Sequence, residues 1–376
     1  MQIKPFATEE FFARYEFTTP HLLCASDCET LTVGDLLRLA GANAADLLDL
    51  RLSYTESAGH PALRAAVAAL YEQVAPEEVV ILGAPEEGIY LTMRALLSPG
   101  DHAVVLTPAY DSLLNLAEHA GADVSRWAVR PRPGGWALDL DELARLLRPA
   151  TRLVVVNFPH NPTGLLPTPA EFEALIDLVR RRGAWLLCDE MYRGLERDPA
   201  ERLPSAADRY ERAVVLSGLS KTHGLPGLRA GWLVVHDAAL RAALINWKHY
   251  TTICAAAPSE LLATVALSAH EALAGRNRRI IAGNLDMAAT FFRRWPELFD
   301  WRPPRAGSVA LVGVNVPSAT AYCHALAHDA GVLLLPGPNL GADDRSVRFG
   351  FGRAGFAAAL AAYEDYLMRL SNSAAS

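Results

Sequence analysis

The sequence contains very little lysine. Of the 35 basic residues only Lys4, Lys221 and Lys248 are lysines, and the others are arginines. A coding sequence rich in guanine and cytosine favours arginine and alanine codons, which accounts for the bias without reference to function. The scarcity still matters for chemistry, because any reaction that needs a lysine amine has three candidate residues.

Cysteine is also scarce, and its pattern argues against a disulfide framework. The five cysteines are odd in number and mostly scattered, as is usual for reduced thiols in the cytosol. The first residues lack the apolar core of a signal peptide, and no Asn-x-Ser/Thr sequon occurs, since Pro162 follows Asn161. We therefore expect a cytoplasmic protein.

The charge and hydropathy patterns argue against two classes of partner. The net charge is −7, so no general basic field attracts nucleic acid. No run of 18 uninterrupted apolar residues occurs, so no membrane span is predicted. With 51% hydrophobic and 20% charged residues, the 376-residue chain is expected to fold into two or three compact units.

Short apolar runs alternate with helical stretches between residues 60 and 235. The runs show no polar alternation, which is typical of strands buried on both faces of a mainly parallel sheet. This pattern predicts an α/β unit with helices on both sides of the sheet. The runs are Val79–Leu82, Ala103–Leu106, Leu153–Val156, Trp185–Cys188 and Val214–Leu216.

The remainder of the chain has a different character. It predicts a smaller α+β unit with a long helical region, short strands and a final amphipathic helix before a loose tail. These elements are expected at 259–295, 308–316, 332–335, 346–350, 355–370 and 371–376. We accordingly divide the chain into an N-terminal arm that belongs with the small unit (1–35), a large unit (36–255) and a small C-terminal unit (256–376).

The residues that follow the apolar runs are the candidates for chemistry, since parallel sheets bind ligands at the carboxyl ends of their strands. One run is followed by Asp189 and, three residues later, Tyr192. Another is followed by a proline-rich turn that contains Asn161. A third leads into a loop of small residues that carries Lys221 and Arg229.

Together these segments resemble the fold-type I pyridoxal phosphate enzymes, and more narrowly the class I/II aminotransferases. The resemblance covers nearly the whole chain, with its most specific motifs at Asn161-Pro162-Thr163-Gly164, Asp189-x-x-Tyr192 and Ser220-Lys221. It implies a mainly parallel seven-stranded sheet between helices, a smaller α+β domain and pyridoxal 5′-phosphate as cofactor. It also implies a homodimer with a shared active site that transfers the amino group of an L-amino acid to a 2-oxo acid.

The resemblance assigns the catalytic roles. Lys221 matches the lysine that forms the internal Schiff base and, once freed, moves the proton from the substrate α-carbon to the cofactor. Asp189 matches the carboxylate that keeps the pyridine nitrogen protonated. Tyr192 and Asn161 match the pair that hydrogen-bonds the phenolic oxygen of the cofactor. Arg348 matches the arginine that clamps the substrate carboxylate, with Asn161 beside it.

The resemblance also assigns the phosphate site, with two departures from the family pattern. Arg229 and Ser220 match phosphate ligands, but Gly218 stands where many relatives have a serine. A helix N-terminus, a favourable phosphate site, opens at Ala84, Pro85 and Glu86. Pro85 has no N–H to donate.

Two tyrosines complete the predicted site. Tyr110 matches the aromatic residue that stacks on the cofactor ring. Tyr54 matches a tyrosine that reaches the phosphate of the neighbouring subunit, which would make the dimer obligatory. The contacts of the substrate side chain are not identified, and candidates lie at 25–30 and 250–254.

Other reactions on the same fold stay open. The runners-up are β/γ-elimination and a cyclisation of hydroxylated arginine similar to that of capreomycidine synthase, which the segment 348–353 and the short arm weakly resemble. A regulatory protein that only binds the cofactor is a third alternative, which the intact Lys221, Asp189 and Arg348 disfavour.

Two further motifs are interpreted as structural. A GxGxxG pattern at 350–355 has no second parallel strand after it to complete a dinucleotide site. His324 and His328 lie four residues apart beside Cys323, but no third metal ligand follows at a sensible spacing. We therefore predict neither a nucleotide nor a metal at these motifs.

Overall fold

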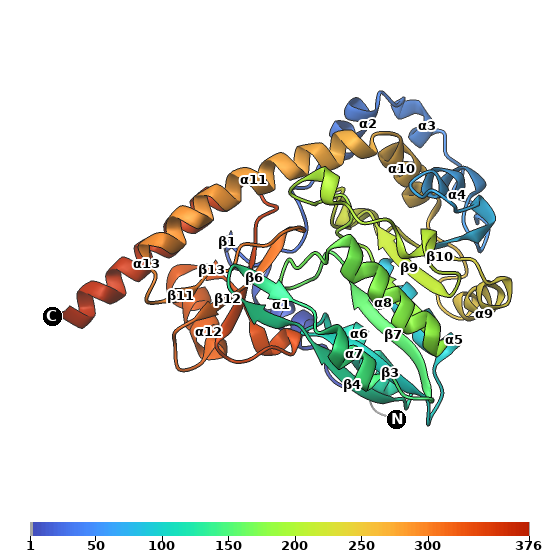
Figure 1. The fold of residues 1–376 in the computed structure, drawn as a ribbon. Coiled ribbons are helices and arrows are strands. Elements are labelled where there is room, and N and C mark those ends of the chain that lie inside the picture. Colours follow the sequence, from blue (N-terminus) through green and yellow to red (C-terminus); the bar gives the residue numbers. More distant parts are fainter. Residues whose placement is uncertain (1–2, 376) are drawn as a thin grey trace.

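The computed structural model describes residues 3–375, which form two units that each contain a sheet (Figure 1). The larger sheet has seven strands. The strand that follows the predicted lysine loop in the sequence lies, in the sheet, between two strands that precede this loop in the sequence. In spatial order the strands are β2 (Val79–Leu82), β10 (Gly231–Val235), β9 (Ala213–Gly218), β8 (Trp185–Asp189), β7 (Thr151–Asn157), β3 (His102–Thr107) and β4 (Asp123–Ala128).

Six of these strands run parallel, five of them at the apolar runs that the sequence predicts, and β10 runs antiparallel to both neighbours. Alternate residues of β7 enter different cores: Val154 and Val156 pack on one face, Leu153 and Val155 on the other. Both faces are apolar because helices cover both, which explains the absence of alternation. The predicted α/β fold is confirmed.

Helices cover both faces of this sheet. Several begin with a side-chain cap; α8, for example, has a capping box between Thr168 and Glu171 and ends at Gly183. The helices of the larger unit are α2 (Val33–Ala40), α3 (Ala44–Leu48), α4 (Pro61–Ala68), α5 (Pro85–Leu96), α6 (Asp111–His119), α7 (Leu140–Leu146), α8 (Pro169–Arg182), α9 (Ala238–His249) and α10 (Ala257–Ser268). A hairpin of β5 (Arg130–Arg132) and β6 (Gly135–Ala137) extends from it.

The smaller unit is built on an antiparallel sheet and a dense aromatic core. The core includes Tyr363, whose ring centroid lies 5.6 Å from that of Phe291 and 6.3 Å from that of Phe349. Its elements are α11 (His270–Arg294), β11 (Phe299–Asp300), β12 (Val309–Val314), α12 (Ala319–Ala330), β13 (Val332–Leu333), β14 (Leu335–Pro336), β15 (Ser346–Gly350) and α13 (Phe356–Ala375).

Two helix predictions need correction. The helical region predicted over 259–295 is divided at Ala269, where α10 ends and α11 begins. The final helix continues through the predicted tail to Ala375, and Ser376 lies outside the described residues. The tail contains neither glycine nor proline, so no helix-breaking residue ends the helix earlier.

The N-terminal segment joins the smaller unit. Helix α1 (Ala7–Tyr15) precedes β1 (His21–Leu22), which pairs in parallel with β13. Cys24 and Cys28 then enter the aromatic core of the smaller unit. In contrast, α10 packs its apolar face into the core of the larger unit. The boundaries at 35 and 255 stay predictions.

The glycines of the GxGxxG motif serve a packing role. A Cβ atom at Gly350 would collide with the backbone of Ala25, and one at Gly352 with that of Asp27. The segment 24–28 therefore lies directly against β15 and its extension. Because β15 belongs to an antiparallel sheet, no βαβ dinucleotide unit forms here.

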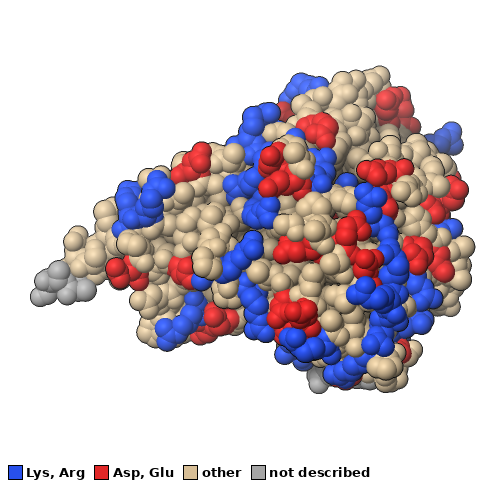
Figure 2. Space-filling model, in the orientation of Figure 1, with Lys and Arg blue, Asp and Glu red and all other residues tan. Residues whose placement is uncertain are grey.

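The surface carries both charges. On the face drawn in Figure 2, basic and acidic side chains are interspersed over both units. Between residues 3 and 375, no helix is long and apolar enough to cross a membrane. Within the same range, no group of three or more potential ligand side chains is placed to hold a metal, and His324 instead contacts the Tyr15 hydroxyl.

We predict that Gly350→Ala lowers the free energy of unfolding by about 2 kcal/mol or more, since the added methyl group must displace the backbone at Ala25. Chemical denaturation measures the loss. The matched control is Gly283→Ala in the exposed middle of α11, where nothing lies within 4 Å of the added carbon. That variant should gain up to about 1 kcal/mol through helix propensity. Equal stabilities for the two variants would contradict the packing role.

Candidate active site

A cavity of about 620 Å³ lies at the carboxyl ends of the sheet strands, bordered by α1 and the smaller unit. All of the predicted site residues line it except Ala84 and Tyr54. Those that do are Pro85, Glu86, Tyr110, Asn161, Asp189, Tyr192, Ser220, Lys221, Arg229 and Arg348. The structure thus brings together, in one cavity, residues that are spread along the sequence from Pro85 to Arg348.

Lys221 follows β9 and extends its amine into the cavity. Its Nζ donates to the Ser26 hydroxyl at 2.8 Å. Burial lowers the pKa of the Lys221 ammonium, and the nearby Arg348 guanidinium lowers it further, against the opposing effect of Asp27. A lowered pKa increases the fraction of neutral amine, which is the form that attacks a carbonyl.

Asp189 is the last residue of β8 and is buried. Burial raises the pKa of its carboxyl to about 6, although the Met191 backbone N–H donates to it at 3.0 Å. No ion pair to Asp189 forms within residues 3–375. A protonated ring nitrogen in the cavity would give this carboxylate the cationic partner it lacks.

Tyr192 presents a second unmet requirement. Its side chain is buried, and among the described residues its hydroxyl makes no hydrogen bond of good geometry, although Ser26 lies nearby. Burial raises the pKa of this phenol, so it remains protonated and able to donate. A buried hydroxyl without a partner is costly, and an oxygen of a bound ligand would satisfy it. The site therefore fits the phenolic oxygen of pyridoxal phosphate.

Arg348 projects from β15 and is only 1% exposed. Its Nε and Nη2 donate to the Cys24 carbonyl at 3.2 and 2.9 Å, and its Nη1 donates to Asn161 Oδ1 at 3.3 Å. These partners are neutral, and no carboxylate pairs with this guanidinium within residues 3–375. A buried cation without a counter-ion favours an anionic ligand such as an α-carboxylate.

Pro85 and Gly218, the two departures from the family pattern at the phosphate end, have one common cause. A Cβ atom at Gly218 would lie 2.8 Å from the Pro85 ring and 2.9 Å from the Ala230 carbonyl. One at Gly231 on the neighbouring strand would also lie 2.8 Å from Pro85. Pro85 thus occupies the volume that a serine side chain at position 218 would need.

Arg229 and Glu86 also border this end of the cavity. Arg229 has the left-handed φ of 49°, a strained conformation for a residue with a side chain, and its Nη1 donates to the Pro226 carbonyl at 3.1 Å. Burial raises the pKa of Glu86 to about 7, and the Ser112 hydroxyl donates to it at 3.2 Å. Glu86 is therefore substantially protonated near neutral pH.

The two predicted tyrosines lie in different surroundings. Tyr110 borders the cavity, and its hydroxyl donates to Glu9 Oε1 at 2.9 Å. Tyr54 is 85% exposed and does not line the cavity of its own chain. The roles of both residues toward a cofactor stay predictions.

Sequence reasoning missed an important wall of the cavity. Helix α1 contributes Glu9 and Phe12, and its C-cap residue Glu16 continues the same wall, which we count with α1 below. The segment after β1 adds Ser26 and Asp27 beside it. The segment 25–30 was a candidate for substrate contacts, whereas 250–254 does not reach the cavity. The spacing of the three α1 residues by three and four positions places them on one helical face and was the available signal.

Comparison with known proteins identifies the family. A family model described as aminotransferase class I and II matches residues 22–367. The chain belongs to this family. It is 35% identical over 353 residues to capreomycidine synthase of Streptomyces vinaceus, which covers 91% of this chain and 88% of the relative.

Two solved structures agree with this assignment. A PLP-dependent aminotransferase from Streptococcus suis has a TM-score of 0.92 at 30% identity and covers 98% of this chain and 99% of its own. The PLP-dependent cyclase OrfR has a TM-score of 0.91 at 30% identity over 98% of each chain. The predictions of a fold-type I enzyme and of pyridoxal phosphate as its cofactor are confirmed.

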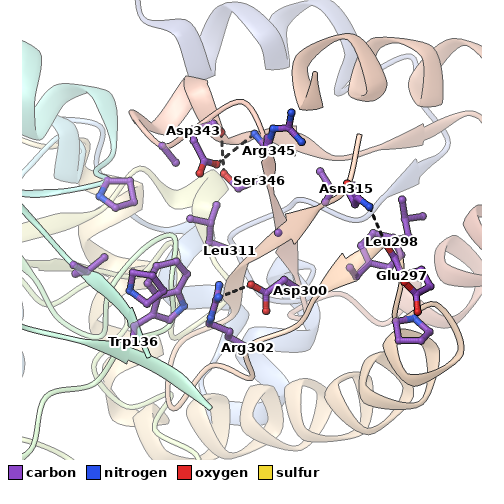
Figure 3. Close-up of a pocket in the computed structure, with 18 residues that line it drawn as sticks. Trp136, Glu297, Leu298, Asp300, Arg302, Leu311, Asn315, Asp343, Arg345 and Ser346 are labelled. Atoms are coloured by element: carbon purple, nitrogen blue, oxygen red, sulfur yellow. Dashed lines mark hydrogen bonds and ion pairs between the residues drawn. The ribbon is translucent and has the colours of Figure 1, made fainter. Parts of the chain in front are cut away.

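A second cavity of about 560 Å³ lies apart from this site. It separates the β5–β6 hairpin from the sheet of the smaller unit (Figure 3). Arg302 pairs with Asp300 there and lies over the Trp136 ring, 5.2 Å from its centroid. None of the predicted site residues lines it.

We predict that Gly218→Ser speeds cofactor release instead of adding a phosphate ligand, because the new side chain collides with Pro85 and displaces the loop. Dialysis followed by absorbance spectra measures the retained cofactor. Ser217→Ala is the matched control, since Ser217 does not line the cavity. Slower cofactor release from Gly218→Ser than from the parent enzyme would refute the steric account.

Proposed function

We propose that this enzyme transfers the amino group of an L-amino acid to a 2-oxo acid. The observation that carries the proposal is the buried Arg348 guanidinium, which has only neutral partners and faces the same cavity as Lys221 and Asp189. A carboxylate bound at Arg348 would place the adjoining α-carbon of an amino acid near the lysine amine. The same clamp suits the carboxylate of the acceptor.

Four residues of the chain have separate roles in the proposed transfer. Bound pyridoxal phosphate supplies an electron sink for the charge left at the α-carbon when its proton departs. Lys221 would hold the cofactor through its amine and, once freed, move the proton at that carbon. Asp189 would stabilise a proton at the pyridine nitrogen. Tyr192 and Asn161 would donate hydrogen bonds to the phenolic oxygen.

Arg348 contributes orientation. Its three contacts fix the guanidinium plane, so a carboxylate that binds it takes a defined direction. Orientation decides which bond at the α-carbon aligns with the cofactor ring and is broken. The deep burial of Arg348 also strengthens its attraction for an anion, since little water screens it.

Cyclisation is the second candidate. It is favoured by the 35% identity to capreomycidine synthase and by the TM-score of 0.91 with the cyclase OrfR. The residues that hold the cofactor serve either reaction, as they would serve β/γ-elimination. A product analysis therefore has to separate the three.

The expected half-reaction distinguishes these chemistries. In stopped flow, an amino acid alone should replace the visible band of the lysine-bound cofactor by the near-ultraviolet band of its amine form, and release a 2-oxo acid. Elimination should release ammonia and restore the visible band. Cyclisation should restore the visible band without a 2-oxo acid. Persistence of the visible band with every amino acid would refute transamination.

Variants at the lysines provide the control for this experiment. Lys221→Ala should abolish the visible band, because no other lysine lines the cavity. Lys4→Ala should retain it, since Lys4 pairs with Glu118 at the surface. A visible band that survives Lys221→Ala would overturn the central assignment.

We further propose that the enzyme is a cytoplasmic homodimer with shared active sites. Large apolar side chains are exposed at Leu52, Tyr54, Tyr250 and Ile253, and Thr55 Oγ1 donates to the Ala255 carbonyl between these segments. Such a patch on a soluble surface is typical of an interface. In a dimer, Tyr54 would reach the phosphate of the neighbouring site.

Tyr54→Phe should therefore weaken cofactor retention while the dimer persists. Light scattering gives the mass of the holoenzyme, and dialysis gives the retained cofactor. Tyr250→Phe is the matched control at the same surface. A monomeric holoenzyme, or equal cofactor retention in the two variants, would contradict the proposed sharing.

A further inference from the structure

Helix α1 forms an acidic wall in the active-site cavity. We propose that Glu9 and Glu16 bind a cationic group at the end of the substrate side chain, so the amino acid substrate is a basic one. This inference rests on the proposed function, because it names the substrate class of the same cavity.

The charges of the cavity divide into two sets. The three basic residues, Lys221, Arg229 and Arg348, are those proposed to hold the cofactor and the α-carboxylate. The acidic residues are more numerous, and several have a partner or a task. The acidic side chains that line the cavity are Glu9, Glu16, Asp27, Glu86 and Asp189.

Three of these acids already have a partner or an assigned role, which leaves Glu9 and Glu16 to bind a ligand. Asp27 forms a two-pronged pair with Arg353, whose Nε and Nη2 donate at 3.1 and 2.7 Å. Asp189 is assigned to the pyridine nitrogen. Glu86 lies at the phosphate end, and burial raises the pKa of its carboxyl to about 7, so its negative charge is reduced near neutral pH. Glu9 accepts one hydrogen bond from Tyr110 and has a second oxygen available.

Glu16 is the least satisfied of the acids. Within residues 3–375 its carboxylate accepts no hydrogen bond and forms no ion pair. Burial raises the pKa of Glu16, and repulsion from Asp27 and Glu9 raises it further. Carboxylates that repel one another at a partly buried site are stabilised by a cation bound between them.

The position of α1 relates this acidic pair to the reacting centre. Phe12 lies between Glu9 and Glu16 on the same helical face, and its ring centroid is 5.9 Å from the Arg348 guanidinium carbon. An amino acid held at Arg348 therefore has its carboxylate beside the middle of α1. A long side chain can then reach one of the flanking glutamates.

The wall is fixed in place at its N-terminus. The backbone N–H groups of Ala7 and Thr8 donate to the Asp111 carboxylate at 3.3 Å, and Asn339 Nδ2 donates to the Ala7 carbonyl at 2.8 Å. Helix α1 thus bridges both units. A preorganised carboxylate binds a cation more tightly than one on a mobile loop, since less entropy is lost.

A metal site and a solvated surface are the other interpretations of such acids. Within the described part of the chain, no three candidate ligands are grouped to hold a metal. The buried Arg348 guanidinium in the same cavity has only neutral partners, and it independently favours an organic ligand that carries a carboxylate. A basic amino acid accounts for the anion site at Arg348 and for the acids on α1 together.

The test compares substrates that differ in charge and little in shape. Arginine is paired with citrulline, and lysine with norleucine, in half-reactions of the holoenzyme. The apparent Kd of each comes from the change in cofactor absorbance. We expect each basic amino acid to exceed its neutral partner by about 100-fold in kcat/KM, as is typical when charged hydrogen bonds are lost.

Variants of α1 assign this preference to its residues. Glu16→Gln keeps the shape and removes the charge, so it should reduce the arginine-to-citrulline ratio about tenfold, mainly through KM and Kd. Glu9→Gln should act in the same direction. Glu10→Gln, on the same helix but outside the cavity, is the matched control and should leave the ratio unchanged.

The outcomes separate this inference from the proposed function. If neutral amino acids react as well as basic ones, or if Glu16→Gln leaves the ratio unchanged, the inference is overturned and transamination stands. If no amino acid yields the near-ultraviolet band but arginine still binds over 10-fold more tightly than citrulline, transamination fails and the charge recognition stands. Equal Kd values for arginine and citrulline would overturn the inference under either chemistry.

Discussion

The burial of the Arg348 guanidinium is the constraint on which the site depends. A cation this deep needs compensating contacts, and they come from two parts of the chain outside β15: the Cys24 carbonyl of the N-terminal segment and the Asn161 amide of the larger unit. The neutral partners hold the guanidinium without neutralising it. Attraction for a ligand carboxylate is therefore retained.

Close backbone approach keeps these parts together. Glycines at 350 and 352 let the segment 24–28 lie directly against the strand that carries Arg348. The same segment brings Ser26 to the Lys221 amine. At the other end of the cavity, Gly218 and Gly231 accommodate the Pro85 ring. Both ends of the site thus depend on glycine for space, not for flexibility.

The sequence predicted the parts of the site that local chemistry determines. Buried parallel strands are apolar throughout, so their ends and the residues after them, such as Asp189 and Lys221, could be located. The edge strand β4 was missed because Asp123, Ser125 and Arg126 interrupt its apolar residues. The α1 wall was missed because its role depends on tertiary packing across more than 300 residues, as the contact of Thr8 with Asn339 shows. No local pattern reveals such a pairing.

The packing of α1 suggests how one site can recognise both the α-carboxylate and the side-chain end of a substrate. Its N-terminus is held by Asp111 of the larger unit and by Asn339 of the smaller one. The position of Glu9 and Glu16 relative to Arg348 is therefore set by contacts of α1 with both units. The cationic group at the end of the substrate side chain and the substrate α-carboxylate would then both be bound best in one position of α1. Substrate binding at both ends would stabilise that arrangement, so selection for a basic side chain and alignment of the α-carbon are coupled through one helix.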